Sequence, residues 1–419
     1  MNRFNYLKNE LYCEDVPVSS IAKDVGTPFY LYSYYTLVNH YRAFDAVFRD
    51  IPHIVCYAYK ANSNLSLCRL LAEEGCGADV VSWGEMRRAL EAGVPPEKIV
   101  FNGNGKTEQE IENAVRTSIL MFIVDSEPEM LLLDRIAGRF KRKARIALRV
   151  NPAISLKTHR HLATGLRDSK FGFACERALE AYRVAKTLSN LQPEGVHMHI
   201  GSQILDVRPF VSALKKIISL VEAIRKEGIE IKWIDLGGGI GITYQDEIPP
   251  TLKAYAKAVI PYIKKSGCRA IFEPGRVIVG NAGVLITRVS YVKDTPVKKF
   301  VVVDAGMSDL IRPTLYDAYH QIKPVAVNAS RKSVKVDVVG PICESGDYFA
   351  KERSISEVKG GELLAIFSAG AYGFSMSSNY NLRPLPAEVL VKGSNYFIIR
   401  KREVYSDMVV KEAMPGILK

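Results

Sequence analysis

The chain has 419 residues, with 57 lysines and arginines against 45 aspartates and glutamates, so its formal net charge is +12. This length allows two domains and a large core, and the scattered positive charge suits small anionic ligands better than nucleic acid. No apolar run approaches the ~18 residues of a membrane span, and the first ten residues lack the apolar segment of a signal peptide. Seven cysteines without C-x-x-C spacing indicate reduced thiols, so we expect a cytoplasmic protein.

The first 33 residues predict only short elements, a strand at Glu10–Cys13 and a helix at residues 19–25. The sequence G-T-P-F-Y-L-Y (residues 26–32) then predicts a turn that leads into a β-rich run. Helical periodicity follows at residues 35–48. This segment therefore precedes a more regular pattern.

From residue 54 onward, short apolar runs typical of strands alternate with helical patterns. Eight strands with intervening helices predict an α/β fold, a (β/α)8 barrel of the TIM type. A doubly wound open sheet is the alternative, because the number of strands does not prove closure. The expected strands are 54–59, 78–81, 99–102, 121–124, 145–150, 195–200, 232–236 and 270–272. The expected helices are 65–74, 83–92, 108–116, 127–139, 176–189, 207–226 and 252–265.

The pattern changes after Glu273, where runs rich in Val and Ile are joined by Gly, Pro and Asn turns. They predict a second, mostly antiparallel β domain, a barrel or a sandwich. Its expected strands are 284–292, 299–303, 334–339, 362–368, 388–391 and 395–400. We therefore expect a barrel domain at residues 34–273 and a β domain formed by residues 1–33 together with 274–419.

Lys60 ends the first strand of the barrel pattern, in the run I-V-C-Y-A-Y-K-A-N (residues 54–62). Lysine is rarely buried, and burial lowers its pKa, which leaves an amine that can form a Schiff base. The alternative is that Lys60 is the first solvated residue after a strand, and this stretch alone favours that interpretation.

The chemistry of such barrels gathers at the carboxyl ends of the strands, and polar residues or glycines follow nearly every predicted strand. These segments are 60–62, 79–82, 102–105, 149–152, 197–202, 237–241 and 273–276. The backbone of Gly237–Gly239 could approach an anion unobstructed, and with Gly201, Ser202 and Arg276 it would form a phosphate cup. Alone, three glycines are more simply a flexible turn, and G-G-G-I-G lacks the G-x-G-x-x-G spacing of a dinucleotide fold.

Glu273 directly follows the last barrel strand, where an isolated carboxylate would be costly to bury unless a protonated ring nitrogen faced it. His197 and His199 are expected on one strand face, either as a core histidine beside a bystander or as a metal-binding pair. An amine, a phosphate cup and a carboxylate together are what pyridoxal phosphate requires. A metal-dependent barrel hydrolase is a distant alternative, because it explains neither Lys60 nor the glycines.

Several longer motifs of the sequence resemble those of a known protein family. The motifs Y-K-A-N (59–62), H-I-G-S (199–202), Gly237–Gly239 and E-P-G-R (273–276) resemble those of the fold-type III pyridoxal-phosphate decarboxylases, which have an alanine racemase-like barrel. Within that family the chain resembles the diaminopimelate decarboxylases, in order from about Phe4 to Met414. The narrower resemblance rests on G-T-P-F-Y-L-Y, T-G-L-R-D-S-K-F-G (164–172), M-S-D-L-I-R-P-T-L-Y-D-A-Y-H (307–320), C-E-S-G-D (343–347) and G-A-Y-G (370–373).

The resemblance implies pyridoxal 5′-phosphate as the cofactor and no metal. Lys60 would hold the cofactor as a Schiff base, His199 would stack on its ring and Glu273 would bind the pyridine nitrogen. The remaining cofactor-binding residues would be Asp79, Ser202, Gly237, Gly238, Gly239, Gly275, Arg276 and Tyr372, of which Ser202, the three successive glycines, Arg276 and Tyr372 surround the phosphate.

The resemblance also implies a homodimer with shared active sites, in which the β domain contributes substrate and interface residues. The C-E-S-G-D segment of the partner would bring Cys343 near the reacting carbon and Glu344 to the substrate. Lys170 would pair with Asp347 across the interface. The other substrate-binding residues would be Arg276, Arg312 and Tyr316 at the distal carboxylate, with further contacts from Tyr372.

The implied activity is decarboxylation of meso-2,6-diaminopimelate to L-lysine and CO2, the last step of lysine biosynthesis. The alternatives are a related decarboxylase of ornithine, arginine or lysine, and a non-catalytic homologue that binds the cofactor. Arg312 suits a distal carboxylate, whereas a diamine-forming enzyme would need an acid there. A non-catalytic homologue should have lost Lys60 or Cys343, and both are present.

Overall fold

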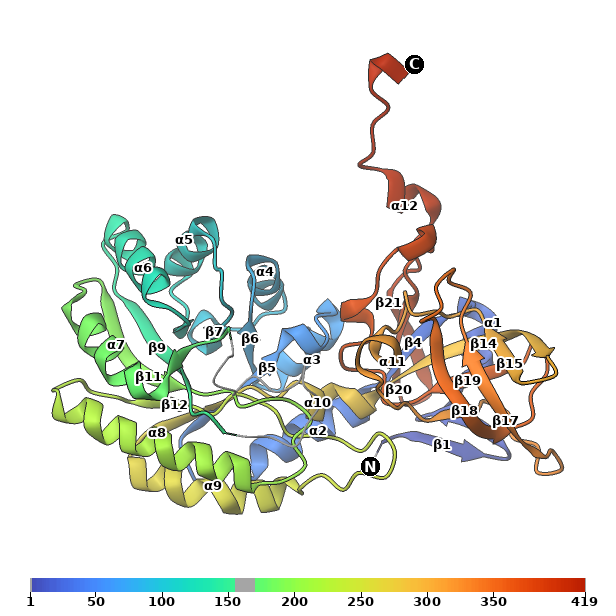
Figure 1. Cartoon of the computed structure of the whole chain (residues 1–419), viewed down its shortest axis with the longest axis horizontal. Helices are drawn as coiled ribbons and strands as arrows, with labels where there is room; N and C mark the ends of the chain where they lie inside the picture. The colour runs from blue at the N-terminus through green and yellow to red at the C-terminus, as the bar shows by residue number, and fades with distance from the viewer. Residues whose placement is uncertain (1, 155–169, 419) are drawn as a thin grey trace. The chain divides into compact units, whose positions relative to one another are not determined.

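The computed structural model describes residues 2–154 and 170–418, which form two compact units (Figure 1). The barrel unit is Val38–Ile278, and the β unit is Met1–Leu37 together with Val279–Lys419. Most of the T-G-L-R-D-S-K-F-G motif, residues 164–169, lies outside the described residues. Across the two described ranges, none of the helices has the length and apolarity that crossing a membrane requires. All seven cysteines are described and are free thiols.

The barrel unit contains eight parallel strands that close on themselves, which confirms the predicted fold. They pair in the order β5, β6, β7, β8, β9, β11, β12 and β13, and β13 pairs back to β5. The carboxyl ends of all eight therefore meet at one end of the barrel. The strands are β5 (His53–Ala58), β6 (Gly77–Val80), β7 (Ile99–Phe101), β8 (Met121–Val124), β9 (Ala144–Asn151), β11 (Leu191–His197), β12 (Trp233–Asp235) and β13 (Arg269–Phe272).

Helices alternate with these strands (Figure 1). Several begin at a hydroxyl residue just after a strand, as when Ser82 and Ser126 accept hydrogen bonds from backbone N–H groups of the first turn. Thr107 and Glu110 form a reciprocal capping box. The helices are α2 (Tyr34–Ala46), α3 (Leu65–Glu73), α4 (Trp83–Glu91), α5 (Glu108–Thr117), α6 (Glu127–Arg139), α7 (Cys175–Thr187), α8 (Arg208–Lys226), α9 (Leu252–Ser266) and α10 (Arg276–Val279); the two-residue strand β10 (Phe173–Ala174) adds to β9.

The β unit is a mostly antiparallel sheet in which the N-terminal strand β4 (Phe29–Ser33) lies between β14 and β20. All five residues of β4 are buried, and Phe29 and Leu31 pack in a core with Val284 and Val389. The N-terminal segment is thus built into the sheet of the C-terminal half. The elements are β1 (Phe4–Leu7), β2 (Glu10–Cys13), β3 (Val16–Pro17), α1 (Val18–Val25), β14 (Gly283–Asp294), β15 (Lys299–Val303), α11 (Arg312–Tyr316), β16 (Ile322–Pro324), β17 (Ser333–Val339), β18 (Tyr348–Ser356), β19 (Leu363–Ile366), β20 (Ala387–Lys392), β21 (Asn395–Arg400) and α12 (Tyr405–Val409).

Among the elements that differ from the expectation, two have a clear physical reason. The sequence does not predict β18, because Lys351-Glu352-Arg353 interrupts its apolar pattern; the strand lies at the end of the sheet, where charged residues are tolerated. The strand expected at residues 195–200 lies earlier in the chain, since β11 begins at Leu191 and ends at His197. His199 therefore lies beyond the strand, and the two histidines do not share a strand face.

Candidate active site

Lys60 lies in the 3₁₀ turn Tyr59–Ala61 that follows β5, and its amine is 2.5 Å from Asp79 Oδ2. Asp79, in β6, is fully buried, whereas the side chain of Lys60 is 37% exposed. Burial raises the pKa of the Asp79 carboxyl and Glu273 raises it further, while the charge of Lys60 opposes both. Lys60 is therefore an amine held at the barrel mouth by a buried carboxylate, which distinguishes it from an ordinary solvated lysine.

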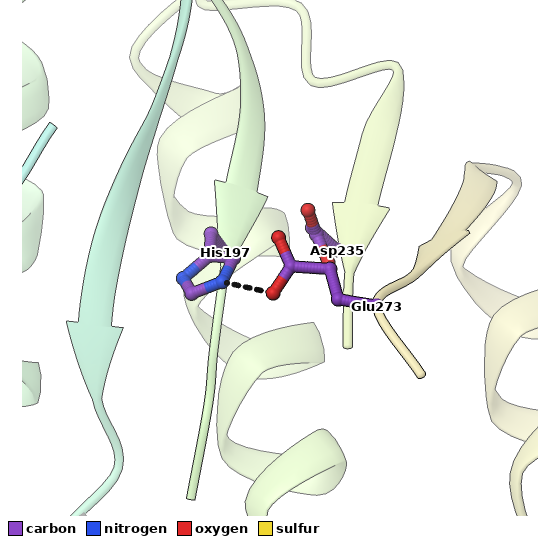
Figure 2. Close-up of side chains that lie close together, drawn as sticks. All are labelled: His197, Asp235 and Glu273. Carbon is purple, nitrogen blue, oxygen red and sulfur yellow. Dashed lines mark hydrogen bonds and ion pairs between the residues drawn. The ribbon is translucent and has the colours of Figure 1, made fainter. Parts of the chain in front are cut away.

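Glu273 directly follows β13, and each of its carboxylate oxygens faces a nitrogen of the protein. Asn102 Nδ2 donates a hydrogen bond to Oε1 at 2.5 Å, and His197 Nε2 lies 3.4 Å from Oε2 (Figure 2). Burial alone would raise the pKa of Glu273, but the charge and hydrogen bond of His197 and the charge of Lys60 lower it below its usual value. Glu273 is therefore ionised, as the partner of a protonated ring nitrogen must be.

Asp235, the last residue of β12, is a second buried carboxyl beside Glu273 (Figure 2). Burial, and then the charge of Glu273, raises the pKa of Asp235 well above its usual value, so the pKa values of the two neighbouring carboxyls are shifted in opposite directions. Ligand atoms of His197, Asp235 and Glu273 lie within 4.8 Å of one another, a spacing that a metal ion could also use. His199 is not part of this group, so the alternative interpretation of His197 and His199 as a metal-binding pair gains no support from it.

The glycine loop after β12 leaves bare backbone where an anion would bind. A Cβ atom at Gly238 would lie 2.3 Å from the carbonyl oxygen of Glu273. At Gly239, whose φ is +115°, it would lie 2.4 Å from the carbonyl oxygen of Gly201. Side chains are therefore excluded at both positions, and the loop suits a phosphate approached by backbone N–H groups.

Arg276 contributes the cation beside this loop. Its Nη2 donates to Ser202 Oγ at 3.1 Å, and its Nη1 donates to the hydroxyl of Tyr244 at 2.5 Å. Gly275 precedes it, and a Cβ there would lie 2.9 Å from Cβ of Ala61, so this glycine lets the loop pass against the turn that carries Lys60. The predicted residues of the phosphate cup that belong to the barrel unit are thus assembled together.

His199 lies against the glycine loop, where its Nδ1 accepts a hydrogen bond from the backbone N–H of Gly238 at 3.2 Å. Burial lowers the pKa of His199 well below its usual value, and the charges of Arg149 and Lys60 lower it further. The ring is therefore neutral, which suits the stacking role that the sequence predicts.

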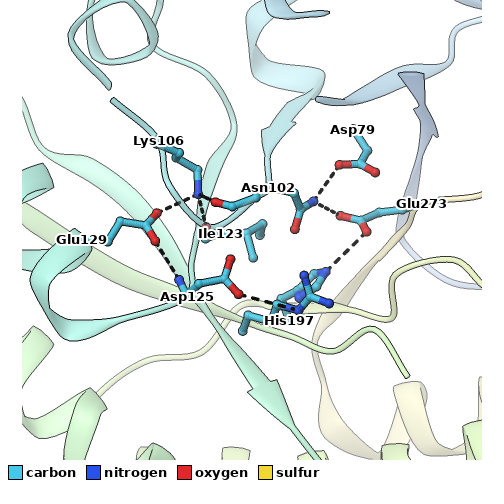
Figure 3. Close-up of polar contacts among 10 residues, drawn as sticks. Asp79, Asn102, Lys106, Ile123, Asp125, Glu129, His197 and Glu273 are labelled. Atoms are coloured by element: carbon cyan, nitrogen blue, oxygen red, sulfur yellow. Dashed lines mark hydrogen bonds and ion pairs between the residues drawn. The ribbon is translucent and has the colours of Figure 1, made fainter. Parts of the chain in front are cut away.

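A buried ion pair between Lys106 and Glu129 fixes the loops after β7 and β8 at the carboxyl end of the barrel strands (Figure 3). The amine of Lys106 donates to the carbonyl oxygens of Gly103 and Ile123 and to Glu129 Oε1, at 2.6, 2.7 and 2.7 Å. Glu129 Oε2 in turn accepts the backbone N–H of Asp125 at 3.0 Å. The side chains of Lys106 and Glu129 are 2% and 9% exposed. This pair therefore ties the loop after β7, which carries Asn102, to the loop after β8.

The β unit holds the predicted residue for the distal carboxylate. Arg312 begins α11, is buried, and its Nη1 is 2.9 Å from His320 Nε2. His320 Nδ1 faces the carbonyl oxygen of Phe367 at 2.8 Å. A ring nitrogen that faces a carbonyl carries the hydrogen, so Nε2 is the acceptor and His320 is neutral. Tyr316 ends the same short helix.

The C-E-S-G-D segment combines exposed and buried residues. Cys343 and Glu344 are exposed. Asp347 is buried, and each of its carboxylate oxygens accepts a backbone N–H of its own chain, at 2.6 and 2.7 Å. Since both oxygens have partners within the chain, its pairing with Lys170 stays a prediction.

Tyr372 has a φ of +56°, a conformation that residues other than glycine rarely adopt. It lies between Gly370 and Gly373. A Cβ atom at Gly370 would lie 2.0 Å from the carbonyl oxygen of Val279, and one at Gly373 would lie 2.4 Å from that of Ala369. The tight G-A-Y-G loop therefore imposes the conformation. Such strain is most often found at functional sites.

The sequence did not single out three residues that contact the predicted site residues, namely Asp235, Tyr244 and His320, and it gave Asn102 and His197 no role at the cofactor. All except Tyr244 are polar side chains at a strand end or inside a recognised motif, and this is the signal that could have found them. Their partners depend on which strands become neighbours, which the sequence pattern alone does not give.

Comparisons with known proteins agree on one group. A family model described as pyridoxal-dependent decarboxylase, pyridoxal binding domain, matches residues 35–280. The chain is 45% identical to a diaminopimelate decarboxylase of Vibrio cholerae, over 99% of both proteins. It is 48% identical to one of Aquifex aeolicus, over 98% of this chain and 97% of the relative. A solved diaminopimelate decarboxylase of M. jannaschii in complex with L-lysine is 40% identical and covers 99% of both chains with a TM-score of 0.95.

Replacing Lys106 should destabilise the fold. Lys106→Met would leave the Glu129 carboxylate buried without its cation, which typically costs about 3–5 kcal/mol. Adding Glu129→Gln should recover most of this loss, because the amide still accepts the N–H of Asp125. Urea unfolding measures both, with the exposed Lys143→Met as the control. If Lys106→Met unfolds within about 1 kcal/mol of the wild type, the ion pair does not support these loops.

Proposed function

Because the chain belongs to the diaminopimelate decarboxylases, within the family of pyridoxal-dependent decarboxylases, we propose that it decarboxylates meso-2,6-diaminopimelate to L-lysine and CO2, with pyridoxal 5′-phosphate as its cofactor. The main support for this proposal is the arrangement of three groups in the barrel unit. The amine of Lys60, the bare glycine loop and the ionised Glu273 are arranged around one barrel mouth. These three groups match the aldehyde, the phosphate and the ring nitrogen of the cofactor.

When bound, pyridoxal phosphate supplies a conjugated cationic ring that accepts the electron pair left as CO2 departs. The protein supplies the groups that bind the cofactor and the charges that surround it. In our proposal Lys60 binds the cofactor and later releases the product, and Glu273 keeps a proton on the ring nitrogen. His199 offers a neutral ring to its face.

The remaining barrel residues hold the phosphate end. We assign Ser202, Gly237–Gly239 and Arg276 to the phosphate, and Asp79 to the orientation of Lys60. The bare backbone at Gly238 and Gly239 supports this assignment, since any side chain there would collide with the neighbouring strand ends. Tyr372 of the β unit joins the phosphate group by the resemblance of its G-A-Y-G motif.

Substrate choice is assigned to the β unit. We propose that Arg312 binds the distal carboxylate of diaminopimelate, with Arg276, Tyr316 and Tyr372 adding contacts. The buried guanidinium of Arg312, oriented by His320, supports this role, because such a group forms a two-pronged pair with a carboxylate. A decarboxylase of ornithine or of lysine would have no use for a buried arginine facing that end of its substrate.

We also propose that the enzyme is a homodimer in which Cys343 and Glu344 act in the active site of the opposite subunit. Their exposure on a short turn supports a role in contacts outside their own unit. A cytoplasmic location, which the reduced cysteines favour, completes the proposal.

The first experiment tests the reaction itself. The purified chain with pyridoxal phosphate should release CO2 from meso-diaminopimelate and form L-lysine, whereas Lys60→Ala should remain folded and lose nearly all turnover because it lacks the amine. Released CO2, L-lysine by chromatography and the visible band of the bound cofactor are the measurements. Wild-type turnover by Lys60→Ala, or no CO2 from meso-diaminopimelate, contradicts the proposal.

Replacing Arg312 should change selectivity. Lysine cannot copy the two-pronged pair, and loss of a buried charge-assisted pair costs about 1.5–3 kcal/mol, or roughly ten- to a hundredfold in affinity. Arg312→Lys should therefore raise KM for meso-diaminopimelate without weakening cofactor binding. L-lysine should be a poor substrate of the wild type.

The matched control for Arg312 is Arg353→Lys, because Arg353 Nη1 donates to the backbone oxygen of His320 at 2.9 Å. It should leave kcat/KM for both amino acids within about threefold of the wild type. A lower melting temperature with unchanged selectivity in Arg312→Lys would mean that Arg312 only braces the β unit.

Mixing two inactive variants tests the shared site. Lys60→Ala and Cys343→Ala chains, mixed in equal amounts under conditions of subunit exchange, should recover about a quarter of the wild-type activity, since half of the dimers are mixed and each has one intact site of two. Exchange is verified with tagged chains. Absence of any recovery after verified exchange rules out sharing.

A further inference from the structure

Asn102, the residue after β7, connects the two ends of the candidate cofactor site. Its Nδ2 donates hydrogen bonds to Asp79 Oδ1 at 2.7 Å and to Glu273 Oε1 at 2.5 Å (Figure 3). All three side chains are at most 4% exposed. One amide group therefore touches the carboxylate that pairs with Lys60 and the carboxylate proposed for the ring nitrogen.

The orientation of this amide has only one chemical solution. Carboxylates accept hydrogen bonds, so the NH2 group must face both of them and give one hydrogen to each. The amide oxygen is left buried, with no hydrogen-bond partner among the residues that the structure describes. An unpartnered buried carbonyl costs free energy, so packing alone does not explain an asparagine at this position.

The contacts continue in both directions from Asn102. The second oxygen of Asp79 faces the amine of Lys60, and the second oxygen of Glu273 faces His197. Asp79 is in β6, Asn102 follows β7 and Glu273 follows β13, so these contacts join strand ends from different parts of the barrel. Acids and nitrogen groups alternate along the whole series.

We propose that Asn102 is a positioning residue that fixes the Asp79 and Glu273 carboxylates relative to each other, so that Lys60 and the ring-nitrogen partner fit a single bound pyridoxal phosphate. This inference rests on the proposed function. Burial and the mutual charge of the two acids raise the pKa of Asp79, and the hydrogen bond from Asn102 opposes that rise. The amide thus also lowers the cost of placing two carboxyl groups close together.

Two substitutions at Asn102 and one control test the inference. Asn102→Ala removes both hydrogen bonds, and Asn102→Asp keeps the shape but places a third carboxylate where two hydrogens are needed. The control is Asn104→Asp, the same substitution at an exposed position two residues along the same loop. Neither Asn102 variant changes a group proposed to touch the substrate.

The measurements are made on apo-enzyme and on cofactor-loaded enzyme. Titration of apo-enzyme with pyridoxal phosphate, followed by the visible absorbance band, should show at least about tenfold weaker binding for Asn102→Ala and a larger loss for Asn102→Asp. In the loaded enzymes kcat should fall at least about tenfold, while KM for meso-diaminopimelate stays within about threefold. Melting temperatures of the apo-enzymes should stay within about 5 °C of the wild type.

The following results would contradict the inference or the proposed function on which it rests. Cofactor binding within twofold of the wild type in both variants, or loss of folding in the apo-enzymes, would make Asn102 a purely structural residue. A cofactor affinity lowered equally by Asn104→Asp would show that any added charge on this loop is sufficient. Failure of the wild type to bind pyridoxal phosphate would instead overturn the proposed function, so the two failures are distinguishable.

Discussion

The burial of several carboxyl groups at one end of the barrel is the constraint on which the rest of this site depends. Asp79, Asp235 and Glu273 are each at most 4% exposed. An isolated buried carboxylate is strongly unfavourable, and neighbouring ones add repulsion. The chain offsets this cost with nitrogen groups: Asn102 contacts Asp79 and Glu273, His197 contacts Glu273, and Asp235 accepts the backbone N–H of the loop that follows it. The pKa values of two of these acids shift in opposite directions: the charge and hydrogen bond of His197 lower that of Glu273, whereas burial and the charge of Glu273 raise that of Asp235.

A closed parallel barrel is well suited to such an arrangement. Each acid or nitrogen group comes from a different strand end, so the pairing of the strands sets the distances and no single loop has to supply them. The Lys106–Glu129 ion pair secures the loop that carries Asn102. The loop of Gly238 and Gly239 leaves bare backbone, and we propose that the phosphate binds there. In our proposal the site has a positive end for the phosphate and a negative end for a protonated ring.

The sequence predicts the barrel well because uninterrupted apolar strands and amphipathic helices alternate over its whole length. It also finds Lys60 and Glu273, since a charged residue directly after an apolar strand is conspicuous. It fails at His199, because two-residue alternation assumes a strand that continues to residue 200, whereas β11 ends at His197. It misses Asp235, since an acid just before three glycines is easily attributed to the loop. The roles of such residues depend on neighbours from distant strands, which no local pattern contains.

The most direct test of the account is to locate the lysine that carries the cofactor. Reduction of the pyridoxal phosphate-loaded enzyme with borohydride, followed by peptide mass mapping, would attach the pyridoxyl group permanently to the lysine that formed the Schiff base. We expect one modified peptide, the one containing Lys60, because its amine is partly exposed and contacts Asp79, whereas the amine of Lys106 is buried in its pair with Glu129. Modification of Lys106 or of another lysine, with Lys60 unmodified, would contradict it.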